Sequence, residues 1–120
     1  MMIGAMSIIR TAYRNELAEF RAARASGDYV GAWHRLERGH IIAQGSLPLH
    51  LHSHVVMLAF AVSQREWSEV AGQALRLFLA PLGTLTGRTP IGSTGRSDVS
   101  AFATMPIPAD IAQIVNAGRD

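Results

Sequence analysis

The chain has 120 residues, of which 48% are hydrophobic, so it is long enough for one domain with its own core and too short for two. It contains no cysteine, which excludes disulfide bonds, zinc fingers and thiol catalysis. The formal net charge is +2, and the eleven basic residues, all arginine, are scattered along the chain, so nucleic acid is not indicated as a partner.

The apolar segments of the chain are too short or wrongly placed for membrane insertion or secretion. The longest strongly apolar run covers residues 55–62, far below the roughly 20 residues that a membrane-spanning helix needs. The apolar opening has no basic residues before it, and Arg10 and Arg14 follow it, which is the wrong order for a secretory signal. We therefore expect a cytoplasmic protein without a membrane partner.

A first amphipathic helix is predicted over residues 7–25. Its apolar side chains recur every three or four residues, whereas Glu16 and Glu19 lie off that face and are expected to be solvated. The apolar positions are Ile9, Tyr13, Leu17 and Phe20, with Ala12 and Ala23 beside them. The next three residues, Ser26-Gly27-Asp28, are expected to end this helix and cap its successor, because glycine accepts left-handed dihedrals and aspartate accepts amide hydrogen bonds.

Three more helices are predicted to follow with short connections. The second covers residues 29–44, and Gly45 to Pro48 form the next break. The third covers residues 47–64, and the link at 65–66 leads to a fourth at 67–79. The expected buried stripe of the fourth helix consists of Trp67, Val70, Ala71, Ala74, Leu75 and Phe78.

The fold class expected from these elements is all-α, within a single domain over residues 1–120. The four helices fill residues 7–80 and form either an antiparallel four-helix bundle or a tetratricopeptide-like array of two hairpins. Residues 81–108, rich in Gly, Ser, Thr and Pro, are expected to form an ordered loop that packs on the helices. A short final helix is predicted over residues 109–117, with Gly118 ending it.

All histidines of the chain lie between positions 34 and 54, which makes this window the best candidate for a site. His50 and His54 have the i, i+4 spacing that lets two imidazoles reach one ion, and a tight turn at Gly45 would bring His40 to face them. Glu37 is expected to add a carboxylate ligand through the Glu-x-x-His pattern.

Glu69 is the second candidate carboxylate, as a fourth ligand or as a group that orients a histidine. The alternative for these residues is structural. His40 and His54 would then be core histidines bonded to neighbours such as Gln44 or Glu69, with His50 on the surface and Glu69 on a solvated face. His34 and His52 are expected to be exposed in either case.

The loop repeats a Thr-Gly-Arg sequence, at residues 86–88 and 94–96, which offers backbone amides and guanidinium groups to an anion. Turn formation and pairing of Arg88 or Arg96 with helix C-termini explain the same residues without a ligand. No phosphate-binding fingerprint and no nucleophile with its base is found in the sequence.

Several segments of the chain are similar to a bacterial family of unknown function, the one numbered 3703. They are LERGHIIAQ, HSHVVML, EVAGQALRLFLAPLG, TGRTPIGSTG and MPIPADI, and the likeness covers nearly the whole chain. The resemblance implies a small helical protein that stands alone, and it assigns no functional residue. Where relatives typically have alanine before the first of these histidines, this chain has Gly39, which favours a close helix approach near His40.

The leading hypothesis from the sequence is a non-enzymatic protein that binds zinc, copper, nickel or iron. His40, His50 and His54 would supply nitrogen ligands, and Glu37 or Glu69 an oxygen. The main rival is a tetratricopeptide-like module that binds a protein partner, or a second copy of itself, without metal. An enzyme that uses a buried histidine as a general base is the third alternative, and the sequence indicates no substrate for it.

Overall fold

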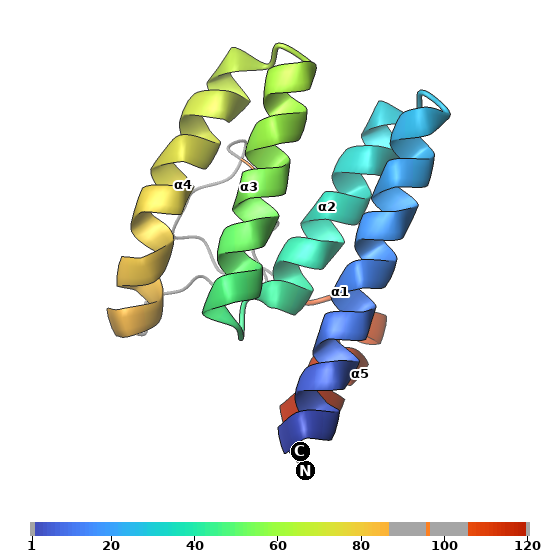
Figure 1. The fold of residues 1–120 in the computed structure, drawn as a ribbon, viewed down its shortest axis with the longest axis vertical. Coiled ribbons are helices and arrows are strands. Elements are labelled where there is room, and N and C mark those ends of the chain that lie inside the picture. Colours follow the sequence, from blue (N-terminus) through green and yellow to red (C-terminus); the bar gives the residue numbers. More distant parts are fainter. Residues whose placement is uncertain (1, 87–95, 97–105, 120) are drawn as a thin grey trace.

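The structure, a computed structural model, describes residues 2–86, 96 and 106–119. The described residues form helices and no strand, which confirms the all-α class (Figure 1). The helices are α1 (Met2–Ala25), α2 (Tyr29–Ala43), α3 (Leu47–Ser63), α4 (Trp67–Thr86) and α5 (Ala109–Arg119).

The turns between the first four helices follow the predicted chemistry. Gly27 has φ +80°, in the left-handed region that glycine accepts without cost, and it ends α1. A side-chain oxygen of Asp28 accepts a hydrogen bond from the amide of Gly31 at 2.9 Å and caps α2. Pro48 lies in the first turn of α3, and Arg65, with φ 56°, turns the chain into α4.

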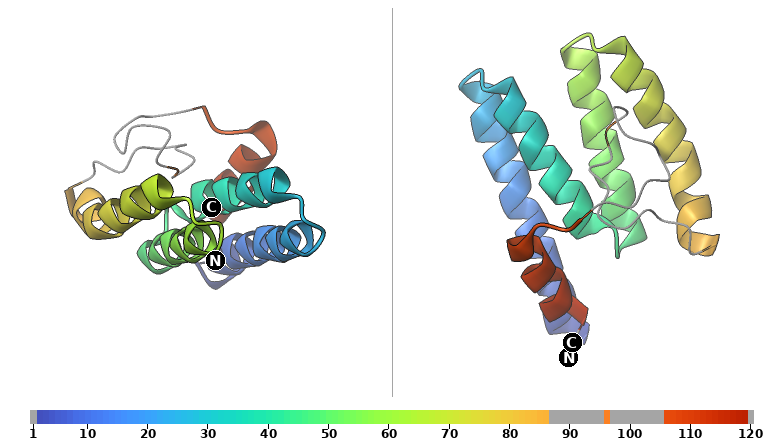
Figure 2. Two further views of the ribbon diagram at one scale, coloured as in Figure 1. Left: turned by 90° about the horizontal axis from the view of Figure 1, so that it is seen from above. Right: turned by 180° about the vertical axis from the view of Figure 1, so that it is seen from behind.

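The helices form two hairpins that lie side by side. α1 packs along α2, and α3 packs along α4, while α2 and α3 bring the two hairpins together (Figures 1 and 2). α5 returns to α1 and α2 at the end of the molecule where the N-terminus lies. The main core lies between α1, α2 and α3, and Phe60 of α3 contacts the rings of Phe20 and Trp33 there.

Two helices run past the residues that were expected to end them. α4 continues through Pro81 to Thr86, although proline removes one backbone hydrogen bond and crowds the carbonyl of Leu77. α5 continues through Gly118 to Arg119. α1 also begins earlier than predicted, at Met2. Of the predicted loop over 81–108, residues 87–95 and 97–105 lie outside the described part of the chain.

The apolar face of α1 is buried as predicted, but two other face assignments were wrong. Glu16 is buried, because Arg35 and Arg38 of α2 both reach its Oε1 at 3.1 Å. The expected stripe of α4 faces solvent at Trp67 and Phe78, whereas the polar side of this helix is buried. A helix with buried polar side chains indicates that its inner face serves hydrogen bonding more than apolar packing.

Candidate metal centre

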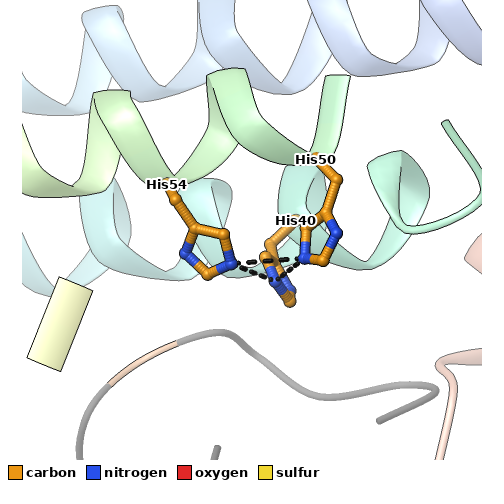
Figure 3. Close-up of side chains that lie close together, drawn as sticks. All are labelled: His40, His50 and His54. Atoms are coloured by element: carbon orange, nitrogen blue, oxygen red, sulfur yellow. Dashed lines mark hydrogen bonds between the residues drawn. The ribbon is translucent and has the colours of Figure 1, made fainter. Parts of the chain in front are cut away.

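Three imidazole rings meet at the contact between α2 and α3. The Nε2 atom of His40 lies 3.1 Å from the Nε2 atoms of both His50 and His54, and those two atoms are 3.2 Å apart. All three side chains are buried, with 2–4% of their surface exposed. Figure 3 shows the rings converging from the two helices. The predicted meeting of three imidazoles is therefore present.

Local sequence explains why the rings meet. His50 and His54 are one turn apart on α3, so their side chains leave the same face of that helix. His40 lies in the last turn of α2, and only the short turn at Gly45 and Ser46 separates α2 from α3. The reversal of direction at this turn places the end of one helix beside the start of the next.

Gly39 precedes His40 on the side of α2 that faces α1. A Cβ atom at this position would lie 3.4 Å from Cε1 of Tyr13 and 3.7 Å from Cβ of Glu16, which are ordinary van der Waals contacts. Alanine would therefore fit here as well, and the helix approach expected from Gly39 does not require glycine. Tyr13 also hydrogen-bonds the exposed His52 of α3, with 2.7 Å between its hydroxyl oxygen and Nδ1.

The triangle of Nε2 atoms has the size of a metal-binding face. With metal–nitrogen bonds of about 2.0–2.1 Å, as for zinc, edges of 3.1–3.2 Å correspond to nitrogen–metal–nitrogen angles of about 100°. This value lies between the octahedral and tetrahedral angles. Among the described residues, His40, His50 and His54 are the only group of three or more ligand side chains whose donor atoms converge in this way.

A chain of hydrogen bonds fixes the tautomer of His54. The side-chain amide of Gln73 donates to Oε2 of Glu69 at 2.7 Å, so its carbonyl oxygen faces the imidazole. That oxygen lies 2.7 Å from Nδ1 of His54 and can only accept, so the neutral ring carries its proton on Nδ1. The lone pair of Nε2 then points into the triangle, which is the form that a metal requires.

The other end of this chain is held by Arg96. Its Nε donates to Oε1 of Glu69 at 3.2 Å, and one terminal nitrogen approaches Glu66 at 3.4 Å. The guanidinium also lies over the ring of Trp33, 3.9 Å from the centroid. Arg96, from the second Thr-Gly-Arg copy, therefore pairs with carboxylates at the start of α4 and not with a helix C-terminus as predicted. Gly87 and Arg88 of the first copy lie outside the described residues.

The two predicted carboxylate ligands do not belong to the converging group. Glu69 is buried and hydrogen-bonds Gln73, which in turn hydrogen-bonds His54, so Glu69 is linked to the triad through Gln73. Glu37 is half-buried and lines a separate open pocket that also includes His34. His34 and His52 are exposed, as expected, whereas the structural alternative wrongly placed His50 on the surface.

Two residues of the site, Gln73 and Arg96, were not predicted as site residues. The i, i+4 spacing of Glu69 and Gln73 on the polar side of α4 was visible in the sequence, but an exposed face explains that spacing equally well. Arg96 follows a glycine-rich stretch without periodicity, so no pattern places it.

Burial determines the protonation of His50 and His54. Burial, with the charge of the neighbouring His54 as a second cause, lowers the pKa of His50 to about 4. Burial also lowers the pKa of His54, an effect that Arg76 reinforces and that the hydrogen bond to Gln73 and the charge of Glu69 oppose. At neutral pH both rings are therefore neutral and their nitrogens are available as ligands.

The lowered pKa values predict a protein that loses stability in mild acid. Between pH 6.5 and about 4, the unfolded chain takes up protons at His50 that the folded protein does not bind. The free energy of unfolding of the metal-free protein should thus fall as pH is lowered through this window, by on the order of 2–3 kcal/mol. Urea unfolding at a series of pH values measures this change in the free energy of unfolding.

Two variants control this experiment. His50→Gln should weaken the pH dependence, because it removes one of the two buried histidines whose pKa is lowered and leaves His54. His34→Gln removes an exposed histidine of α2 and should leave the dependence as it is in the wild type. A wild-type stability that does not change between pH 7 and pH 4 would contradict the prediction.

A family model described as "Protein of unknown function (DUF3703)" matches residues 7–115. No curated protein and no solved structure matches the chain. The kinship with tetratricopeptide repeats therefore stays a prediction. Within the described residues, no helix combines the length and the hydropathy that a membrane crossing requires.

Proposed function

The chain belongs to the family described as "Protein of unknown function (DUF3703)", and we propose that it binds a divalent transition-metal ion through the Nε2 atoms of His40, His50 and His54. The observation that carries the proposal is the triangle of these three atoms, with edges of 3.1–3.2 Å, in a buried place. Three imidazoles without cysteine suit zinc, copper, nickel and iron, and affinity among the divalent ions rises toward copper.

The positions of the protons on the imidazole rings support metal binding by the three Nε2 atoms. Nε2 of His54 presents a lone pair, because its Nδ1 donates to Gln73. In the metal-free protein the three Nε2 atoms lie 3.1–3.2 Å apart and can be joined only through shared protons, whereas a cation accepts all three lone pairs together.

The proposed ligand set leaves coordination positions open. Three protein nitrogens on one side of a zinc ion leave a fourth position for water or another donor. Such a position serves metalloenzymes, which use it to activate water, and also proteins that pass a metal to a partner.

The test is a titration of chelator-treated protein with zinc, copper, nickel and cobalt salts. A ligand that binds only the folded state adds about 2.7 kcal/mol to its stability at 100 times Kd, so the thermal midpoint should rise by several degrees. Replacing any one of His40, His50 and His54 with alanine should abolish most of the rise. His34→Ala, at an exposed position, is the matched control and should retain it.

Two outcomes decide the proposal. Saturable binding of one ion per chain, lost in the three variants and kept in the control, supports it. A thermal midpoint that ignores every one of the four metals, in a protein that is purified without bound metal, contradicts it.

A further inference from the structure

α4 is amphipathic, but its polar face is buried and its apolar face is exposed, which is the opposite of an ordinary surface helix. Its charged residues, Glu69 and Arg76, are buried together with Gln73. The opposite face carries no charge, and its large side chains are 51–71% exposed. They are Trp67, Leu75, Phe78 and Leu82, and the exposed Ala71 and Ala74 lie between them on the same face. We call these six residues the α4 stripe.

The α4 stripe is large and open enough to be an interface. Four side chains of about 200 Å² each, half to two-thirds exposed, present on the order of 450 Å² of apolar surface. The largest patches on monomeric proteins have about this size and are often functional. α4 lies at the edge of the row of helices, where α3 covers one of its sides (Figure 1).

The order of residues in the α4 stripe fits a second copy of itself. When two such helices pack antiparallel about an axis between Ala74 and Leu75, each of these residues faces the other in the partner chain. The same register places Ala71 opposite the partner's Phe78, and Trp67 opposite the partner's Leu82. Near the axis, Leu75 and Phe78 then lie opposite alanines, which lets the two helices come close together. Farther from the axis, where crossing helices diverge, the pair of Trp67 and Leu82 fills the wider space.

We propose that the chain forms a homodimer with two-fold symmetry, in which the α4 stripes of two copies pack antiparallel in this register. The α4 stripe carries no charge that would select a different, oppositely charged protein. An interface around a two-fold axis requires a self-complementary surface, and the pairing of large with small side chains meets this requirement. The polar inner face of α4, which bonds His54 through Gln73, is not part of this interface.

The state of assembly is the first measurement. The wild-type protein should sediment at twice the 13.0 kDa of one chain, with or without chelator. Phe78→Glu should sediment as a monomer, because it places a charge opposite Ala71 of the partner. Val30→Glu, at an exposed valine of α2, is the matched control and should remain dimeric. A monomeric wild type at high micromolar concentration, or a dimer that chelator dissociates, would overturn the proposal.

Disulfide trapping tests the register. Because the chain contains no cysteine, only the introduced cysteines can form disulfide bonds. Chains with Ala71→Cys and chains with Phe78→Cys, distinguished by a size tag, are mixed and oxidised. The mixed pair should be linked, whereas Ala71→Cys alone should not, since the two copies of that position lie about 10 Å apart along the helix. Linkage of Ala71→Cys chains to each other, or no mixed linkage, contradicts the antiparallel register.

Discussion

Replacing Phe60 with alanine is expected to lower the free energy of unfolding by about 3–5 kcal/mol. Phe60 of α3 is 1% exposed, and its ring lies 5.1 Å from that of Phe20 on α1 and 5.0 Å from that of Trp33 on α2, between ring centroids. One side chain therefore joins the second hairpin to both helices of the first. Its loss leaves a cavity that rigid neighbouring helices cannot fill.

Urea unfolding of chelator-treated protein measures this loss without a contribution from bound metal. Val30→Ala removes an exposed side chain on α2 and should change the free energy of unfolding by no more than about 0.5 kcal/mol. A loss of less than about 1 kcal/mol for Phe60→Ala would mean that the hairpins are held together elsewhere.

Replacing Gln73 with leucine is expected to weaken metal binding about 10-fold to 100-fold. Leucine has a similar volume but accepts no hydrogen bond, so Nδ1 of His54 loses its partner at 2.7 Å. The imidazole can then place its proton on Nε2, and the metal must displace that proton before it binds. The carboxylate of Glu69 also loses the amide that donates to it.

Competition with a coloured chelator measures the affinity, and the thermal midpoint of the metal-free variant separates this effect from a general loss of stability. Gln113→Leu, at an exposed glutamine of α5, is the matched control and should bind as the wild type does. If Gln73→Leu binds metal with unchanged affinity, the hydrogen-bond chain has no role in orienting His54.

The fold class and most helix boundaries could be predicted because they depend on local chemistry. Gly27 and Asp28 end and begin helices through their own dihedral angles and hydrogen bonds, and the spacing of Tyr13, Leu17 and Phe20 defines one buried face. The helix through Pro81 could not be predicted, because local chemistry there argues for an end.

The facing of α4 shows where pattern reasoning fails. A stripe such as that of Trp67 and Phe78 is assigned to the core by the general rule that apolar faces are buried. Here the interior requires Glu69 and Gln73 for the hydrogen bonds that reach His54, so the apolar face turns outward. Which face of α4 points inward depends on contacts between residues far apart in the sequence, and the periodicity within one helix carries no information on such contacts.

The histidine site, like the turns, could be predicted because it depends on residues that are close together in the sequence. His50 and His54 share a helix face by spacing, and the tight turn after His40 determines which residues of α2 oppose them. Arg96 was beyond prediction, since it reaches Glu69 from 27 residues away in sequence through a segment without periodicity.

The last helix, α5, is held to the rest of the protein by a salt bridge and by an apolar contact, which respond differently to salt. Arg38 reaches both Glu16 of α1 and Asp110 of α5, and the carboxylate of Asp110 faces water. Dissolved ions compete with such a contact, whereas the apolar anchor Ile111 beside it is indifferent to them. We therefore expect added salt to weaken the attachment of the C-terminal end while the rings around Phe60 stay packed.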